Sequence, residues 1–494
     1  MTTEPTLPGH FSRSRPMPEP PASRLRNPDL APATVKSWSG YSVFALWMSV
    51  LHNVGAYTFA IGFFFHGLGT WTVLAAMLVA LVLVYALMNL SGAIGQRTGV
   101  PYPVVARISF GVFGANVPAL VRGVLAVFWY GVQTYLGSVA ISALALRLAP
   151  GLESWNRTGF LGLSALGWCA FLALWAAQLL VVRHGMEAVR KYQNWAGPAV
   201  YLVMFVLLGW VLVRTGFAPG VEVSPERVHG GSAVLQFASI VGLIVSFFGT
   251  FLLNISDFTR ASPSPRSMRR ANLWGLPVNF LVFAVTVAVV TTASVTLFGE
   301  PITDPIELVQ RIDNTPVLVF ATLVFTVATV GVNVAANVVS PAFDFANVAP
   351  RYITFERGGF IAAVGSILVC PWALYSSPVV VDYFIGGLGA LLGPLFGVIM
   401  SDYYLVRRTR VVVDELYVEG GGRYWYRRGV NPRAMLSAAI GAAVAIPVAL
   451  VPAWHAAAPF SWALGAALAA GTYLAASRVA APGPAGSAPE ATHV

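Results

Sequence analysis

Two asparagines, Asn333 and Asn337, lie four residues apart inside a long apolar run. An α-helix repeats every 3.6 residues, so their carboxamides would share one helix face. A carboxamide presents an N–H donor beside a C=O acceptor, which matches a ligand edge that carries the same two groups. Hydrogen bonding to a neighbouring helix would also account for both residues. The pair therefore predicts either a polar ligand site or a polar contact between helices.

Trp129 and Gln133 form a second pair with the same spacing, in the string FWYGVQTY. An indole stacks well on a planar ligand, and the glutamine would add a carboxamide on the same helix face. The alternative is a packing tryptophan beside a glutamine that bonds a neighbouring helix.

Two apolar runs contain residues that disfavour a continuous helix. His52 and Asn53 precede Gly55 in the first run, and Gly242 and Gly249 flank a Ser-Phe-Phe string in the sixth. Broken helices at membrane depth occur where they are buried in protein or line a cavity. Interruptions at corresponding positions of two halves indicate a transporter site. Polar contacts between helices are the alternative interpretation.

The elements that would position these residues are membrane-spanning helices. The chain has 494 residues, of which 57% are hydrophobic and 10% are charged. In soluble domains about a quarter of the residues are charged. Twelve apolar ranges are long enough to span a bilayer. The predicted spans are 42–66, 70–94, 115–148, 159–182, 196–214, 234–255, 275–298, 316–341, 359–376, 381–405, 434–452 and 459–479.

The distribution of Lys and Arg predicts the orientation. Both tails and the even-numbered gaps between spans hold 24 of these residues, the odd-numbered gaps hold 5, and Arg122 lies near the inner end of the third span. This asymmetry predicts a multi-pass protein of the cytoplasmic membrane with both termini in the cytoplasm. It also explains the net charge of +10 without nucleic acid as a partner. The basic string at 407–410 is interpreted as a topology anchor, with contact to anionic lipid as the alternative.

Enzymatic chemistry lacks its usual signatures. No P-loop, no HExxH and no GxGxxG after a strand occurs, and no loop is long enough for a catalytic domain. Cys169 and Cys370 lie in apolar runs, which gives neither a disulfide framework nor zinc spacing. We therefore expect no enzymatic activity, no catalytic residue, no cofactor and no metal site.

Eight strings, which run in order from Asn27 to Arg408, resemble the first class of nucleobase–cation symporters. The similarity is greatest to bacterial allantoin permeases and extends to hydantoin and uracil transporters. The strings are NPDLAP (27–32), HNVGAYTFAIG (52–62), TGVPYPVVARISFGVFGANVPALVR (98–122), WYGVQTYLGS (129–138), RHGMEAVRKYQNWAGPAVYLV (183–203), LLNISDFTR (252–260), NVAANVVSPAFDFANVAPRYITFERG (333–358) and LGPLFGVIMSDYYLVRR (392–408).

The resemblance implies an all-α membrane protein with 12 helices in a leucine-transporter-type fold. Two inverted five-helix repeats would occupy 39–215 and 230–406, and two extra helices 434–479. A cytoplasmic loop would cover 407–433, and disordered tails would cover 1–38 and 480–494. Residues carried over by motif as ligand contacts are Trp129, Gln133, Asn337, Asn53, Phe247, Phe248 and Asn333.

The same resemblance identifies candidates for ion coupling. Sodium-coupled relatives carry two adjacent hydroxyl residues on helix eight, where this chain has Gly331 and Val332. Sodium prefers hard oxygen ligands, so their loss argues against sodium and leaves the proton as the leading ion. Intramembrane ionisable groups are functional candidates, which makes His52 the proton candidate; a neutral His52 bonded within the helix break is the alternative. The candidate ion residues are His52, Ser49, Ala328, Gly331 and Val332.

The predicted function is import of a planar, uncharged ring such as allantoin, uracil or a hydantoin, by ion-coupled alternating access in a monomer. Stacking would come from Trp129, and edge hydrogen bonds from the carboxamides. A sodium-coupled hydantoin-type or cytosine/purine symporter is the alternative within the class. A facilitative channel or a substrate sensor is the alternative of another class.

Overall fold

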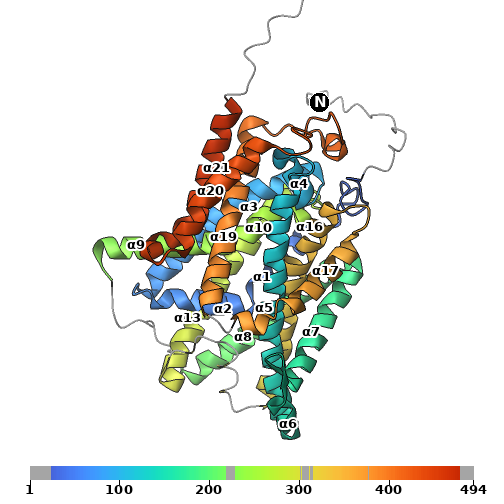
Figure 1. Ribbon diagram of the computed structural model, residues 1–494. Helices are drawn as coiled ribbons and strands as arrows, with labels where there is room; N and C mark the ends of the chain where they lie inside the picture. The colour runs from blue at the N-terminus through green and yellow to red at the C-terminus, as the bar shows by residue number, and fades with distance from the viewer. Residues whose placement is uncertain are drawn as a thin grey trace, which may run out of the picture.

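The computed structural model describes residues 24–217, 228–300, 315–375 and 378–478, together with Ile302, Glu307 and Arg311. Within these ranges the chain is helical apart from connecting loops and one short antiparallel hairpin, β1 (Gly159–Phe160) paired with β2 (Leu163–Ser164). The helices form a bundle with α4 at one end and α6 at the other (Figure 1). The predicted all-α architecture is thus confirmed in outline.

Each of the 12 predicted ranges contains helix. The α-helices are α1 Gly40–Leu51, α2 Val54–Gly62, α3 Thr70–Thr98, α4 Tyr102–Phe110, α5 Asn116–Leu148, α6 Glu153–Arg157, α7 Ala165–Arg183, α8 Gly185–Arg214, α9 Gly230–Phe247, α10 Gly249–Asn254, α11 Ser256–Thr259, α12 Pro265–Leu273, α13 Asn279–Phe298, α15 Thr315–Val332, α16 Ser340–Val348, α17 Phe355–Leu368, α18 Pro371–Tyr375, α19 Pro378–Ser401, α20 Pro432–Leu450 and α21 Ser461–Arg478.

Shorter turns of other helix types join or extend these helices. The 3₁₀ turns are η1 Phe63–Phe65, η2 Pro150–Leu152, η6 Val413–Tyr417 and η7 Pro452–Phe460, and the π-helices are η3 Trp274–Val278, η4 Asn333–Val339 and η5 Asp402–Val406. One π-helix therefore carries both asparagines of the eighth predicted span. Short π segments inside helices are frequent at functional sites.

Nine helices in the described ranges are long and apolar enough to cross a membrane. The number is ten if α1 and α2, which meet at a bend of 68°, form one broken span. The chain is therefore a multi-pass membrane protein. The predicted count of 12 spans remains a prediction.

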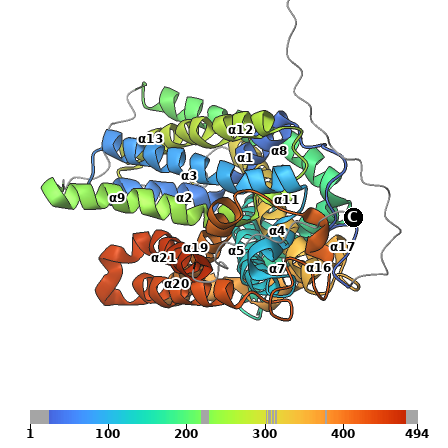
Figure 2. The same cartoon turned by 90° about the horizontal axis from the view of Figure 1, so that it is seen from above.

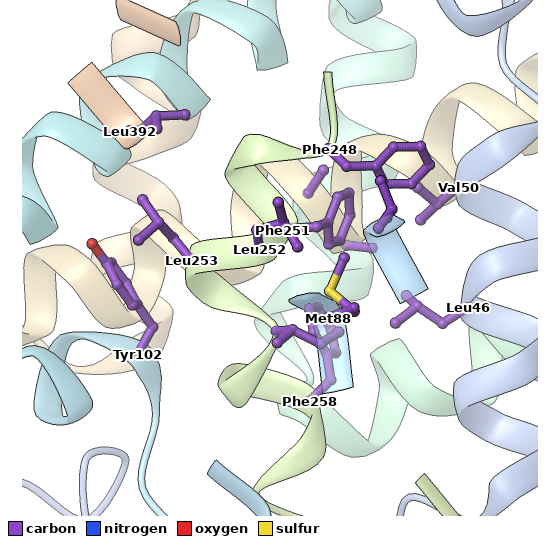
Figure 3. Close-up of a cluster of buried hydrophobic side chains, with 14 of the residues drawn as sticks. Leu46, Val50, Met88, Tyr102, Phe248, Phe251, Leu252, Leu253, Phe258 and Leu392 are labelled. Atoms are coloured by element: carbon purple, nitrogen blue, oxygen red, sulfur yellow. The ribbon is translucent and has the colours of Figure 1, made fainter. Parts of the chain in front are cut away.

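The helices meet around α5, which contacts α7, α15, α16 and α17. Seen along the bundle, α19, α20 and α21 lie on one side, and α3, α12 and α13 lie on the opposite side (Figure 2). Apolar side chains fill the space between the first broken helix and α10. Phe248 and Phe251 face Val50 there, with Met88 of α3 alongside (Figure 3).

Residues 24–38 differ from the predicted disordered tail. Residues 1–23 of that tail and all of the second predicted tail, 480–494, lie outside the described ranges. Leu25, Leu30 and Trp38 are buried in the core. The Asn27 carboxamide donates to the carbonyls of Pro350 (3.0 Å) and Ile353 (2.9 Å). The prediction of disorder is therefore wrong for residues 24–38. The Pro-rich composition of this stretch indicated disorder, but a few of its side chains have partners in distant loops.

Close contact between α19 and α21 depends on glycine. A Cβ atom at Gly397 would collide with the backbone carbonyl oxygen of Ala466, and one at Gly393 would collide with that of Trp462. Small residues let membrane helices approach closely and gain dispersion contacts. The pair α19 and α21 therefore depends on close fit of the two backbones.

Gly397→Ala is expected to lower the Tm of the purified protein, because the added methyl group forces the two helices apart at a cost of about 1–3 kcal/mol. Gly471→Ala is the matched control, since a Cβ atom there meets nothing within 4 Å. A thermal-unfolding measurement in detergent compares the two variants. Equal Tm values for Gly397→Ala and wild type would contradict the tight α19–α21 contact.

Candidate functional site

The first broken helix is stabilised by one asparagine side chain. α1 ends at Leu51, and Asn53 adopts an extended backbone before α2 begins. The Asn53 Nδ2 group donates to the Val50 carbonyl (2.8 Å), and its Oδ1 accepts from the Ala56 N–H (3.0 Å). Helix ends leave N–H and C=O groups without partners, and an Asn cap supplies them. The predicted interruption at this position is confirmed.

Two further irregular segments face this break. α9 stops at Phe247, and α10 restarts at Gly249, so the chain turns at an aromatic pair. The π-helix η4 carries Asn337 on a widened turn between α15 and α16. In each irregular segment, side chains point in directions that a regular helix would not give them.

These three segments and α5 surround a cavity of about 850 Å³. Six of the seven residues predicted to contact a ligand line it. They are Asn53, Trp129, Gln133, Phe247, Phe248 and Asn337. The cavity extends to His66 after α2 and to His455 in the α20–α21 connection, so it opens away from the end of the bundle that carries α4.

Two carboxamides keep hydrogen-bonding capacity for a ligand. The Gln133 Nε2 group donates to Asn53 Oδ1 (3.2 Å), and Asn337 Nδ2 donates to Asn333 Oδ1 (2.8 Å). A carboxamide has two N–H donors and one C=O acceptor, so one bond leaves each side chain with a donor and an acceptor. Asn53 uses both ends of its side chain in the helix break, and its main effect is to position Gln133.

Asn333 does not line the cavity, contrary to its placement among the ligand contacts. It is fully buried behind Asn337 and donates toward Tyr130 O (3.2 Å), Thr134 Oγ1 (3.1 Å) and Gln178 Oε1 (3.2 Å). Because η4 is a π-helix, residues four apart no longer share one face in the way that an α-helix predicts. Asn333 therefore fixes the orientation of Asn337.

The aromatic residues of the cavity differ in what they can offer. Trp129 is half-buried, with part of its side chain accessible. Phe247 is 38% exposed and stacks on Phe59 at 4.7 Å between ring centroids, whereas Phe248 is 2% exposed and packs near Trp47. Trp129 and Phe247 thus provide the accessible aromatic faces.

Sequence reasoning missed several cavity residues, among them Phe59 and Gln236. The Oε1 atom of Gln236 lies 2.9 Å from His66 Nδ1. Phe59 follows Gly55 by four residues on α2, which would have placed it on the same helix face. A Cβ atom at Gly55 would lie 3.2 Å from Gln133 Nε2, so the glycine lets the backbone approach that carboxamide.

The predicted ion-coupling residues separate into three places, of which His52 occupies one by itself. Ser49, Ala328 and Gly331 are buried between α1 and α15, where a Cβ atom at Gly331 would collide with Ser49 Oγ. Val332 lines the cavity instead. Gln193 of α8, which the sequence reasoning missed, donates from Nε2 to the Gly331 carbonyl (2.8 Å).

His52 lies in an aromatic setting rather than on the cavity. Its Nδ1 is 3.2 Å from the Tyr57 hydroxyl, and its ring packs edge-on against Tyr201 (4.5 Å) and Phe283 (5.3 Å). Among the described residues, no group of three or more His, Cys, Asp or Glu is arranged to hold a metal ion.

Known proteins resemble this chain over most of its length. The family described as permease for cytosine/purines, uracil, thiamine and allantoin matches residues 31–469. The allantoin permease of Bacillus subtilis (strain 168) is 37% identical over 468 residues, which cover 93% of this chain and 95% of that protein. The hydantoin permease of Microbacterium maritypicum is 28% identical over 442 residues, 86% of this chain and 84% of that one.

A solved structure shares the fold. It is a transporter of the nucleobase-cation-symport-1 family in a closed conformation with bromovinylhydantoin bound. It matches with a TM-score of 0.74 at 24% identity and covers 92% of this chain and 96% of its own.

Asn53→Ala is expected to lower the Tm by more than Ser164→Ala does. Both residues cap a helix, and losing an N-cap typically costs about 1 kcal/mol. Asn53 also satisfies the Val50 carbonyl and holds Gln133 inside the bundle. Ser164 caps the Gly167 N–H at the start of α7, and its only other bond is an exposed one to Asn156 Oδ1 (3.2 Å) among the described residues. Thermal unfolding of both variants measures the difference, and a larger loss in Ser164→Ala would contradict the role assigned to Asn53.

Proposed function

Because the chain belongs to the family of permeases for cytosine/purines, uracil, thiamine and allantoin, and is therefore a transporter rather than an enzyme, we propose that it imports a planar, uncharged ureide or nucleobase ring. Allantoin, uracil and hydantoin-like rings are the candidates. Transport would proceed across the cytoplasmic membrane by ion-coupled alternating access.

The observation that carries this proposal is the convergence of Trp129, Gln133 and Asn337 on one cavity. The indole offers a flat surface for stacking, and the two carboxamides come from separate elements, α5 and η4. Each has a free donor and a free acceptor, the pattern that an imide or ureide edge requires. A ring without those groups would leave the carboxamides unpaired and be rejected.

The names of the relatives support the same class of substrate. Allantoin and hydantoin are both flat rings in which N–H and C=O groups alternate, and permeases named for them share 37% and 28% identity with this chain.

We further propose 12 spans with two inverted repeats, 39–215 and 230–406, followed by two extra helices. The breaks between α1 and α2 and between α9 and α10 would be the corresponding interruptions of the two repeats. The distribution of Lys and Arg would place the α4 end, with both termini, in the cytoplasm. The described cavity would then open to the outside, and a single chain would be the functional unit.

For the coupling ion, we favour the proton over sodium. Around Gly331, a glutamine N–H group already donates to the carbonyl oxygen that could have served a cation. The helix carries Gly331 and Val332 rather than hydroxyl residues, so fewer hard oxygen ligands are available. Sodium coupling, as in a hydantoin-type symporter or a cytosine/purine symporter, is the alternative.

Two functions of another class share the same cavity. A facilitative channel would conduct without saturation, and a substrate sensor would bind without flux. Saturable accumulation against a gradient in proteoliposomes separates a symporter from both. Accumulation that never exceeds the external concentration would contradict ion coupling.

Purified wild-type protein is expected to bind at least one of allantoin, uracil, cytosine and hydantoin, independently of sodium. Trp129→Ala is expected to abolish that binding, because the stacking surface is lost, while its Tm changes little. A thermal-shift screen with and without sodium, followed by titration of the best ligand, measures both effects. Trp195→Ala is the control, since Trp195 is 59% exposed and away from the cavity. Equal affinity of Trp129→Ala and wild type would contradict the stacking arrangement.

Asn337→Ala is expected to weaken binding by about 1–3 kcal/mol, roughly 5- to 150-fold, because a polar group of the bound ring loses its partner. Asn116→Ala, which removes a carboxamide near the α4 end of α5, serves as the comparison. Titration of the same ligand to each variant gives the ratio. An Asn337→Ala affinity within twofold of wild type would place the edge contacts elsewhere.

A further inference from the structure

Three charged side chains are buried together between the cavity and the α4 end of the bundle. They are Arg122 near the start of α5, Asp257 of α11 and Asp344 of α16, and each is at most 1% exposed. The cavity and the proposed ring site use none of them. Burying an ionised group without a partner is costly, so such clusters in membrane proteins call for a function.

The two carboxylates differ in their hydrogen bonds. Asp257 Oδ1 accepts from the Tyr102 backbone N–H (2.7 Å), and Oδ2 accepts from the Ser340 hydroxyl (2.9 Å). Neither oxygen of Asp344 has a hydrogen-bond partner among the described residues. Donors aimed at a carboxylate stabilise its ionised form, so Asp257 is suited to carry the negative charge and Asp344 is not.

The Arg122 guanidinium forms its hydrogen bond with a group other than the two carboxylates. Its Nη2 group donates to the Ala336 carbonyl (2.6 Å). Nε and Nη1 of Arg122 have no partner in the described part of the chain. The guanidinium therefore lies near Asp344 without an ion pair, and it keeps two donors available.

The groups that face Asp344 do not stabilise its ionised form as well as those that face Asp257 stabilise Asp257. Asp257, Arg122 and the Tyr102 phenol are the titratable or charged groups that face it. Arg260 also faces Asp257, and it donates to the Asp29 carbonyl (2.9 Å). Asp257 thus has two guanidiniums and two hydrogen-bond donors near it, whereas Asp344 has only Arg122 and no hydrogen bond among the described residues. A neutral, protonated Asp344 avoids burying an ionised carboxylate without a hydrogen-bond partner.

The cluster is connected to the ring site through one short segment. Ala336, whose carbonyl accepts from Arg122, lines the cavity and directly precedes Asn337. Asp344 follows on the same continuous segment, η4 to α16. If Asp344 loses its proton, the free donors of Arg122 become hydrogen-bond partners of the Asp344 carboxylate. The hydrogen bond from Arg122 to the Ala336 carbonyl then changes as well.

We propose that Asp344 is the proton-binding group of transport, with Asp257 and Arg122 as positioning residues. In the state described here, with the cavity open away from α4, the carboxyl group of Asp344 holds the proton. On opening at the α4 end, Asp344 releases that proton to water and pairs with Arg122. The inference rests on the proposed function, because it assigns the coupling site of a symporter.

The test uses full-length protein in proteoliposomes with a labelled ring substrate identified by the binding screen. Asp344→Asn mimics the protonated carboxyl group. It is expected to retain substrate exchange between the two sides and to lose the acceleration of uptake by an inside-alkaline pH gradient. Asp402→Asn is the matched control, because Asp402 is an equally buried carboxylate that Arg407 Nε binds at 2.8 Å. It is expected to keep the pH-driven acceleration.

Three results would overturn the inference. The first is pH-driven accumulation in Asp344→Asn equal to that of wild type. The second is loss of that accumulation in His52→Gln with retention in Asp344→Asn, which would assign the proton to His52. The third is wild-type uptake driven by a sodium gradient and indifferent to a pH gradient. Absence of both exchange and binding in wild type would instead contradict the proposed function.

A measurement on wild type covers the case in which Asp344→Asn does not fold. Infrared spectroscopy at neutral pH detects the C=O stretch of a buried protonated carboxyl group. The expected band is present in wild type and shifted in Asp344→Glu, and neither result depends on transport. A wild-type spectrum without such a band would overturn the inference.

Discussion

Polar groups at membrane depth have no water to satisfy them, and this constraint organises the molecule. The break in the first span would be unstable if Asn53 did not satisfy the carbonyl of Val50 and the N–H of Ala56. In η4, Asn333 holds α5, α7 and Asn337 together through one carboxamide. On the cavity wall, Gln133 and Asn337 each keep a donor and an acceptor that a ligand can reach. Away from it, Asp344 and Arg122 are buried with groups that have no hydrogen-bond partner in the described part of the chain.

The same constraint divides the bundle into two kinds of contact. At Gly393 and Gly397, α19 and α21 approach so closely that glycine is required. Around the cavity, helices meet through carboxamides and aromatic rings, which tolerate small displacements better than interlocked backbones do. A transporter needs both, because one group of helices must stay rigid while another moves.

The sequence predicted the features that depend on local pattern. The break at His52 and Asn53 could be predicted because two polar residues and a glycine interrupt an apolar run, and six cavity residues followed from motif and helical spacing. It could not predict that Asn333 lies behind Asn337 rather than on the cavity wall, because a π-helix leaves no simple signature in composition.

Residues whose environment depends on distant segments were also missed. Gln193 lies in a helix whose position against Gly331 no local pattern reveals. Leu25 and Leu30 sit in a stretch that reads as disordered, yet they find apolar partners. Asp344 could be placed near a helix end, but its lack of partners emerges only when α4, α5, α11 and α16 are assembled.

The widened turn of η4 has a consequence for how this protein can be compared and engineered. Removing one residue from 333–339 would restore ordinary helical winding and leave α15 and α16 facing almost as before, because a π turn holds about one residue more than an α turn. Asn337 would then lose its present position on the cavity wall, whereas Asp344 beyond the turn would keep its neighbours. An alignment that misplaces a one-residue gap inside this stretch would thus pair residues from opposite walls.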